Sequence, residues 1–284
     1  MIVITGATGQ LGRLVIQNLL KTTPAAQIVA AVRSPEKASD LAALGVQVRH
    51  ADYTQPASLA TAFKGASKLL LISSSEVGQR LPQHKAVIEA AAQAQVQLLA
   101  YTSLLHADRS PLGLATEHQA TEALLAASGL PYVLLRNGWY TENYLASAPA
   151  ALEHGAVIGC AQDGRIASAS RADYAAAAAA VLTAEGQAGK VYELAGDTSY
   201  TLTELAAELA RQSGKPVAYQ DMPQEVFAST LEKIGLPSGL AQMLADSDTG
   251  ASKGGLFDDS HQLSQLIGRP TTPLAESVQQ ALAG

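Results

Sequence analysis

The stretch Gly6-Ala7-Thr8-Gly9-Gln10-Leu11-Gly12 decides the fold of this chain of 284 residues. It directly follows the β-branched run Ile2–Thr5 and directly precedes the amphipathic segment Leu14–Leu20, so we predict a strand, a glycine turn and a helix in that order. Glycine adopts positive φ and leaves room for a phosphate, and the first turn of a helix presents unpaired N–H groups. The turn is therefore expected to bind a dinucleotide pyrophosphate; a plain connection between strand and helix is the alternative.

Short apolar runs alternate with helical patterns through the first half of the chain. The expected strands are Ile2–Thr5, Ile28–Val32, Gln47–His50, Lys68–Ile72, Gln97–Thr102 and Tyr132–Arg136. The expected helices are Gly9–Lys21, Pro35–Leu44, Pro56–Lys64, Leu81–Gln95 and Leu114–Ser128. Near-continuous apolar strands that alternate with helices predict a parallel sheet covered on both faces, which is a doubly wound α/β fold.

The pattern is looser after Asn137. Ala156–Ile158 and Arg165–Ser168, on either side of the turn-forming Gln162-Asp163-Gly164, predict a hairpin or two short strands. The other expected elements are an alanine-rich helix over 171–182, a strand over 191–195 that rejoins the sheet, a helix that starts at Thr201-Leu202-Thr203-Glu204 and ends at Gly214, and a helix that opens at 222–225. Gly250–Gly255 is expected to form a loop near the active cleft.

Composition and charge exclude several classes of function. A net charge of −6 without any block of Lys or Arg argues against nucleic acid as a partner. The single cysteine, Cys160, fits a cytoplasmic protein in which it fills core space. No signal peptide is expected before the first strand, and the longest low-polarity stretch, Ala175–Leu182, is too short to span a membrane. The six histidines lack metal-ligand spacing, so no metal is expected.

The end of the second predicted strand selects the cofactor. Open parallel sheets bind ligands at the carboxyl ends of their strands, and NAD enzymes usually place an acidic residue there for the ribose hydroxyls. This chain instead has Ala30-Ala31-Val32-Arg33-Ser34. The forked donors of Arg33 can pair with a 2′-phosphate, which a carboxylate would repel. NADP(H) is the expected cofactor, unless Arg33 is only a solvated surface residue.

Two other predicted strand ends carry polar and aromatic side chains. Ser73-Ser74-Ser75 follows the fourth strand, where small hydroxyl residues could line the ribose and nicotinamide or form an ordinary loop. The sixth strand runs into Arg136–Tyr144, which holds the only tryptophan, Trp139. Flat apolar surface beside amide donors suits an aromatic ring or a quinone near the nicotinamide, although core packing alone could explain Trp139.

The glycine turn, Arg33, Ser73–Ser75, Tyr101–Ser103 and Arg136–Asn143 together resemble the NmrA-like branch of the atypical short-chain dehydrogenase/reductases. The resemblance covers essentially the whole chain. It implies a Rossmann domain over residues 1–136, whose core is rejoined by strands within about 156–196, and a smaller C-terminal α/β lobe over 137–284 that mainly binds substrate. The implied NADP(H) contacts are Gly6, Thr8, Gly9, Gln10, Leu11 and Gly12 for the pyrophosphate, Arg33 for the 2′-phosphate, Ser73, Ser74 and Ser75 for the ribose region, and Asn137, Gly138, Trp139, Tyr140 and Asn143 for the nicotinamide side.

One departure from the wider superfamily concerns the proton donor. The common reductases use Tyr-x-x-x-Lys, yet none of the nine tyrosines here has a lysine four positions later. The remaining catalytic candidates are Tyr140, Asn143 and His118, of which His118 is expected to be a helix-surface residue rather than an acid. Gly250-Ala251-Ser252-Lys253-Gly254 matches a nucleophile elbow in letters only, because no strand precedes it.

The expected function is hydride transfer from NADPH to a quinone or a similar flat, electron-poor acceptor. Water can protonate the resonance-stabilised phenolate that results, so the protein would contribute orientation and a dry cleft. The alternative is a redox-sensing regulator that binds NADP(H) without turning it over. The sequence leaves open whether the chain acts alone or as a homodimer.

Overall fold

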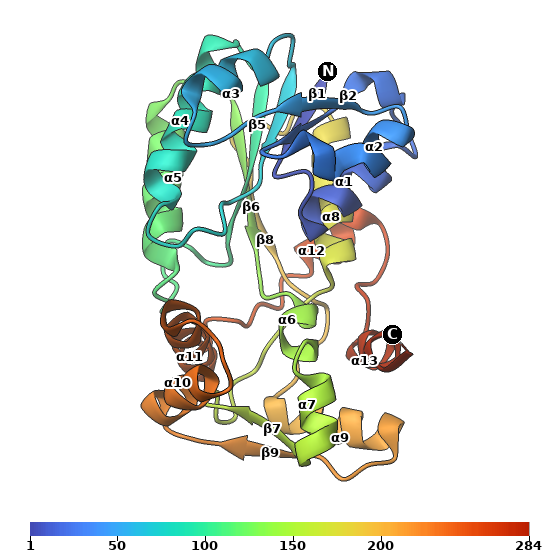
Figure 1. The fold of residues 1–284 in the computed structure, drawn as a ribbon, viewed down its shortest axis with the longest axis vertical. Coiled ribbons are helices and arrows are strands. Elements are labelled where there is room, and N and C mark those ends of the chain that lie inside the picture. Colours follow the sequence, from blue (N-terminus) through green and yellow to red (C-terminus); the bar gives the residue numbers. More distant parts are fainter. Residues whose placement is uncertain (284) are drawn as a thin grey trace. The chain divides into compact units, whose positions relative to one another are not determined.

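Figure 1 shows the fold of residues 1–283, the part of the chain that the computed structural model describes. The chain divides into two compact units, each with its own core. The first unit consists of Met1–Leu104, Thr116–Asn137 and Arg171–Tyr192. The second consists of Leu105–Ala115, Gly138–Ser170 and the chain from Glu193 onward.

A seven-stranded sheet with the order β3-β2-β1-β4-β5-β6-β8 forms the centre of the first unit. Its strands are β1 (Ile2–Thr5), β2 (Ile28–Val32), β3 (Gln47–His50), β4 (Lys68–Leu71), β5 (Leu98–Leu104), β6 (Tyr132–Asn137) and β8 (Val191–Leu194), whose last two residues belong to the second unit. Strands β1 to β6 pair in parallel, and β1 lies between β2 and β4. The strand order therefore reverses between β1 and β4, the place where open parallel sheets bind ligands. The prediction of a doubly wound Rossmann fold is confirmed.

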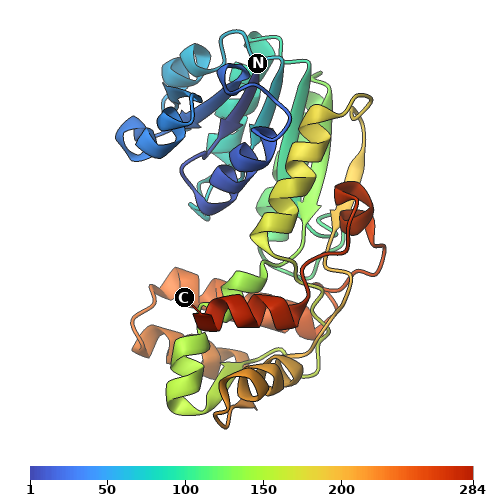
Figure 2. The same ribbon diagram turned by 90° about the vertical axis from the view of Figure 1, so that its right-hand side faces the viewer.

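Helices cover both faces of this sheet, with α3, α4 and α5 on one face and α1 and α8 on the other (Figure 1). The helices of this unit are α1 (Gln10–Leu19), η1 (Ala25–Gln27), η2 (Pro35–Ala38), α2 (Ser39–Ala43), α3 (Pro56–Ala62), α4 (Arg80–Gln93), α5 (Ala115–Ala127) and α8 (Arg171–Thr183). Figure 2 shows α8, in yellow, lying along the sheet, and it packs against α1. The small side chains of its alanines allow this close approach.

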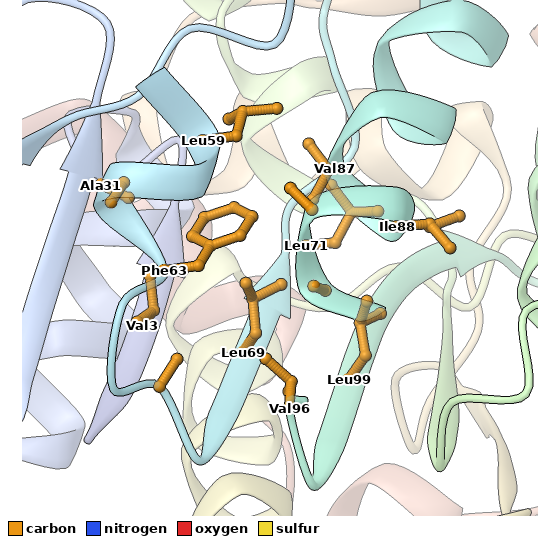
Figure 3. Packing of buried hydrophobic residues seen from close by; sticks show 14 of the residues in the cluster. Val3, Ala31, Leu59, Phe63, Leu69, Leu71, Val87, Ile88, Val96 and Leu99 are labelled. Atoms are coloured by element: carbon orange, nitrogen blue, oxygen red, sulfur yellow. The ribbon is translucent and has the colours of Figure 1, made fainter. Parts of the chain in front are cut away.

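The core between the sheet and helices α3 and α4 is shown in Figure 3. Phe63, which follows α3, and Val87 of α4 are fully buried against Val3, Leu69 and Leu71 of the strands. Full burial of a side chain of this size contributes about 1.5–3 kcal/mol. This packing fixes the carboxyl ends of β1 and β4, on which the site is built.

The second unit is mainly helical, with a short parallel pair of strands. Its elements are α6 (Thr141–Leu145), α7 (Ala148–His154), β7 (Ala156–Gly159), α9 (Leu202–Ser213), β9 (Ala218–Asp221), α10 (Gln224–Lys233), α11 (Ser238–Ser252), α12 (Gln262–Ile267) and α13 (Leu274–Ala283). Helix α9 begins with the predicted capping box of Thr201 and Glu204 and ends at Gly214 in the left-handed conformation. Cys160 is buried with Phe227 in its core, as expected for a packing cysteine.

The predicted hairpin after Ala156 is wrong, and of the alternative, two short strands, only the first is present, as β7. Strand β7 pairs in parallel with β9, and Ile166 only makes an isolated bridge with Tyr200. The backbone after β7 is held by side chains instead: the N–H of Cys160 donates to Asp248 Oδ2 at 3.1 Å. The pairing partner lies about sixty residues further along the chain, so local alternation could not reveal it.

The predicted loop at Gly250–Gly255 is also wrong in its first half, because α11 continues through Ser252. A Cβ on Gly250 would lie 2.6 Å from Leu112 Cδ1. This glycine therefore permits close packing rather than a loop, and the Ser252 of the apparent nucleophile elbow is helical. Among residues 1–283, no helix is both long and apolar enough to cross a membrane.

Candidate functional site

The glycine turn lies at the carboxyl end of β1. Gly6 has φ +58°, a conformation that favours glycine, and its carbonyl oxygen accepts the N–H of Gly9 at 2.9 Å. A Cβ on Gly12 would lie 2.6 Å from the Gly6 oxygen and 2.7 Å from Ala7 Cα. Helix α1 therefore starts in direct contact with the turn, an approach that only glycine at position 12 allows.

The first turn of α1 leaves its N–H groups available to a ligand. The residue before the helix, Gly9, provides no side-chain cap, and Gly9 and Gln10 are exposed. Leu11 is buried and anchors the helix, while Arg13 Nε donates to the carbonyl oxygen of Thr8 at 3.1 Å. Free N–H groups and the positive end of the helix dipole fit a pyrophosphate.

Tyr53 contacts the ends of the two strands next to the turn. Its hydroxyl donates to Thr5 Oγ1 at 2.6 Å and lies 2.9 Å from the carbonyl oxygen of Ile72. Thr5 Oγ1 in turn donates to the carbonyl oxygen of Leu70 at 3.0 Å, which joins the ends of β1 and β4. Burial raises the pKa of Tyr53 above its usual value, so the hydroxyl keeps its proton and remains a donor. No motif in the sequence indicated a role for this residue.

The serine loop after β4 is fixed through its backbone. The N–H of Ser73 donates to Thr102 Oγ1 at 2.9 Å, and the N–H of Ser74 donates to His84 Nε2 at 2.9 Å. Arg80 Nε donates to the Ser74 carbonyl oxygen at 2.7 Å. Three side chains from β5 and α4 thus hold the loop at the ligand-binding edge of the sheet.

The tautomer of His84 follows from its second partner. His84 Nδ1 lies 2.9 Å from Thr121 Oγ1, which itself donates to the carbonyl oxygen of Glu117. Thr121 therefore accepts from His84, so the proton lies on Nδ1 and Nε2 is free to accept from Ser74. Burial, assisted by the charge of Arg80, lowers the pKa of His84 to about 3, so the ring is neutral at physiological pH.

Arg33 lies at the end of β2 with its guanidinium exposed, and it is connected to the serine loop. Arg33 Nη1 donates to Glu76 Oε1 at 2.9 Å, and Glu76 directly follows Ser75. The first unit thus brings together the glycine turn, the serine loop and the arginine expected to select the cofactor. A dinucleotide with a 2′-phosphate fits this donor set.

His118 differs from the expectation that it lies on the helix surface. It is 5 % exposed, and its Nδ1 lies 2.7 Å from the hydroxyl of Tyr101. Burial is the main cause that lowers the pKa of His118 to about 3, with Arg80 assisting. The ring is therefore neutral near pH 7 and carries no imidazolium proton to donate.

The segment after β6 begins in the first unit and continues in the second. Asn137 is buried, and its Oδ1 has no hydrogen-bond partner within residues 1–283. In the second unit, the Gly138 N–H donates to the carbonyl oxygen of Leu194 at 2.7 Å. The Asn137 oxygen retains its acceptor capacity at the strand end to which the resemblance assigns the nicotinamide side.

Three candidates of the second unit lie around the start of α6. Trp139 is 8 % exposed, with its ring centroid 6.5 Å from that of Tyr144. Tyr140 directly precedes α6 and Asn143 lies in it; the Asn143 N–H donates to the Tyr140 carbonyl oxygen at 3.0 Å. Tyr144 donates its hydroxyl proton to Asp248 Oδ1 at 3.0 Å. The segment from Trp139 to Tyr144 is thus held by a hydrogen bond to α11, which the sequence did not indicate.

The chain is similar to known proteins that bind NAD(P)H. The model of an NAD(P)H-binding family matches residues 6–185, which include the glycine turn, Arg33 and the serine loop. The chain belongs to the NmrA-like NAD(P)H-binding family.

Several members of this family are similar over the full length. The chain is 68 % identical over 278 residues to quinone oxidoreductase 2 of Escherichia coli, covering 98 % of this chain and 97 % of that protein. The crystal structure of an NADPH-dependent quinone oxidoreductase from E. coli, complexed with NADPH, matches with a TM-score of 0.98 at 67 % identity. The match covers 99 % of this chain and 100 % of that chain. The triphenylmethane reductase of Citrobacter sp., complexed with NADP(H), has a TM-score of 0.95 at 44 % identity and covers 99 % of this chain and 100 % of that chain.

Proposed function

We propose that this chain is an NADPH-dependent oxidoreductase that reduces quinones and similar flat, electron-poor acceptors. The observation that carries the proposal is the full-length similarity to an NADPH-dependent quinone oxidoreductase, in a chain with Arg33 at the end of β2. The regulator alternative is less well supported, because the similar proteins named above are reductases.

The first unit supplies the groups that hold NADPH. The N–H groups at the start of α1 bind the pyrophosphate, Arg33 binds the 2′-phosphate, and the fixed backbone of Ser73–Ser75 meets the ribose region. When bound, NADPH supplies a hydride from its nicotinamide ring. We assign the nicotinamide side to the segment from Asn137 to Asn143 and the acceptor mainly to the second unit.

The chain contributes orientation more than acid–base chemistry. His84 and His118 have pKa values lowered to about 3, so neither is a proton donor near neutral pH. Tyr140 and Asn143 are half-buried and present a ring face and an amide to an acceptor, next to the buried Trp139, and water protonates the reduced product. We further propose a cytoplasmic protein without a nucleic-acid partner, in keeping with its net charge of −6 and its buried cysteine. Analytical ultracentrifugation would decide between monomer and homodimer.

NADPH oxidation followed at 340 nm tests the proposal. The assay compares benzoquinones, naphthoquinones and cationic dyes as acceptors, each with and without the protein. We expect turnover with quinones, and less with NADH than with NADPH. Saturable NADPH binding without turnover of any acceptor would instead identify a redox sensor.

A further inference from the structure

The guanidinium that we assign to the 2′-phosphate already has a carboxylate partner. Arg33 Nη1 lies 2.9 Å from Glu76 Oε1, and the two side chains are 70 % and 45 % exposed. Glu76 is not a residue that the family's nucleotide-binding pattern led us to expect in the site. A phosphate that approaches Arg33 must therefore share the guanidinium with this acid.

Glu76 is a fixed charge rather than a mobile surface side chain. Its other oxygen, Oε2, accepts from Nε2 of the buried Gln83 at 2.7 Å, and its own N–H donates to Ser74 Oγ at 3.1 Å. The hydrogen bonds from Gln83 and then Arg33 hold the pKa of Glu76 below its usual value. The carboxylate is therefore ionised at neutral pH and held in place from α4.

We propose that Glu76 limits the preference of this chain for phosphorylated over non-phosphorylated dinucleotides. The inference rests on the proposed function, because it requires Arg33 to bind the 2′-phosphate. Glu76 is thus a specificity-determining residue that acts against the 2′-phosphate and not on the rest of the dinucleotide.

Two opposing effects of Glu76 can be compared. Holding Arg33 in position favours the phosphate, but an exposed ion pair is worth at most about a fivefold effect. Repulsion between a carboxylate and a phosphate dianion that share one guanidinium, at a separation of about 6 Å in water, is on the order of tenfold. The repulsion of the phosphate by Glu76 is therefore larger than the gain from holding Arg33 in position. Neither effect acts on a dinucleotide that lacks the 2′-phosphate.

The variant Glu76→Gln tests the inference, because it removes the charge and keeps an acceptor for Gln83. Dissociation constants for NADPH and NADH are measured by the fluorescence of the bound reduced nicotinamide at low ionic strength. We expect NADPH to bind about three- to tenfold more tightly, NADH to change by less than about twofold, and the gain to shrink at high salt. Glu89→Gln is the matched control, since Glu89 is 60 % exposed and paired with Lys85.

Unchanged or weaker NADPH binding by Glu76→Gln would overturn the inference. Unchanged binding would show that Glu76 has no effect on the phosphate, and weaker binding would show that it positions Arg33. Failure of the proposed function has a different signature. If the unaltered chain does not bind NADPH, or if Arg33→Ala leaves NADPH binding intact, the cofactor assignment is wrong. If Arg33→Ala weakens NADPH selectively while Glu76→Gln has no effect, only the role of Glu76 is wrong.

Discussion

Replacing Arg33 by alanine should reduce the affinity for NADPH and leave that for NADH nearly unchanged. A charge-assisted contact with a phosphate contributes about 1–3 kcal/mol, which corresponds to a factor of about 5–150 in affinity. The guanidinium is 70 % exposed, which favours the lower part of this range. Removing Arg33 also leaves Glu76 without its cation near the phosphate, which adds to the loss. We expect a decrease of at least about tenfold.

The same substitution should affect folding very little, because the ion pair between Arg33 and Glu76 lies at the surface. Exposed pairs of this kind contribute about 0–1 kcal/mol to the free energy of unfolding. Urea unfolding of the variant therefore separates a loss of binding from a loss of structure. Any large fall in stability would show that Arg33 has a structural role that the contacts do not indicate.

Arg211→Ala is the matched control for the binding measurement. Arg211 is 65 % exposed and pairs with Glu208 at 2.6 Å, so it resembles Arg33 in exposure and pairing but belongs to the second unit. Titrations of the unaltered chain and both variants with NADPH and NADH, followed by nicotinamide fluorescence, give the affinities to be compared. Equal losses for NADPH and NADH in Arg33→Ala would refute the assignment of this residue to the 2′-phosphate.

Gly12, His118 and Trp139 are the next residues whose roles can be tested by experiment. Gly12→Val places side-chain atoms where even a Cβ would lie 2.6 Å from the Gly6 oxygen, so we expect about 1–3 kcal/mol loss of stability in urea and weaker binding of both NADPH and NADH; unaltered binding of both would show that the turn does not hold the pyrophosphate. Burial lowers the pKa of His118 from 6.5 to about 3, so this histidine takes up a proton at a higher pH in the unfolded chain than in the folded chain. The contribution of His118 to the free energy of unfolding is therefore fully present above pH 6.5 and is lost as the pH falls towards 3. Between pH 7 and pH 5, the free energy of unfolding of His118→Gln should therefore fall by about 1–2 kcal/mol less than that of the unaltered chain. Urea titrations at the two pH values measure both changes, and equal changes would contradict a buried neutral ring. Trp139 is the only tryptophan, so a quinone titrated into the NADP⁺ complex should quench tryptophan emission to saturation, whereas quenching equal to that of free tryptophan would place the acceptor elsewhere.

Much of the first unit could be predicted from the sequence because its signals are local. The expected strand Ile28–Val32 has the observed bounds, since an apolar β-branched run of that length identifies a buried parallel strand by itself. In the second unit, Thr201 and Glu204 form the expected capping box for the same reason, since its signal lies within four consecutive residues. Where the signal and the structure involve the same few residues, sequence reasoning was sufficient.

The errors arose where the partner of a segment lies far along the chain. Strand β7 pairs with β9, and Gly250 is glycine because it packs against Leu112. Within the site, the contact of Tyr53 with Thr5 spans 48 positions. No period or spacing records such contacts.

The structure places Arg33 and the serines at strand ends, as the sequence indicated, but the sequence did not predict the contacts that these residues make. The sequence indicated Arg33 and the serines from their places at strand ends, yet it gave no reason to connect Arg33 with Glu76. It also assigned His118 to the surface, because a polar residue in a helical pattern is usually solvated. Burial of that ring depends on the Tyr101 hydroxyl of a neighbouring strand, which supplies the hydrogen bond that a buried polar group needs.

A single-turnover experiment follows the proposed hydride transfer from NADPH itself. The protein, in excess over NADPH, is mixed with benzoquinone in a stopped-flow instrument, using NADPH with either two protons or two deuterons at the nicotinamide C4. We expect absorbance at 340 nm to fall in one phase, one equivalent of hydroquinone to form, and deuteration to slow this phase. A steady trace with NADPH fully bound, or a decay no faster than without protein, would contradict the proposed hydride transfer.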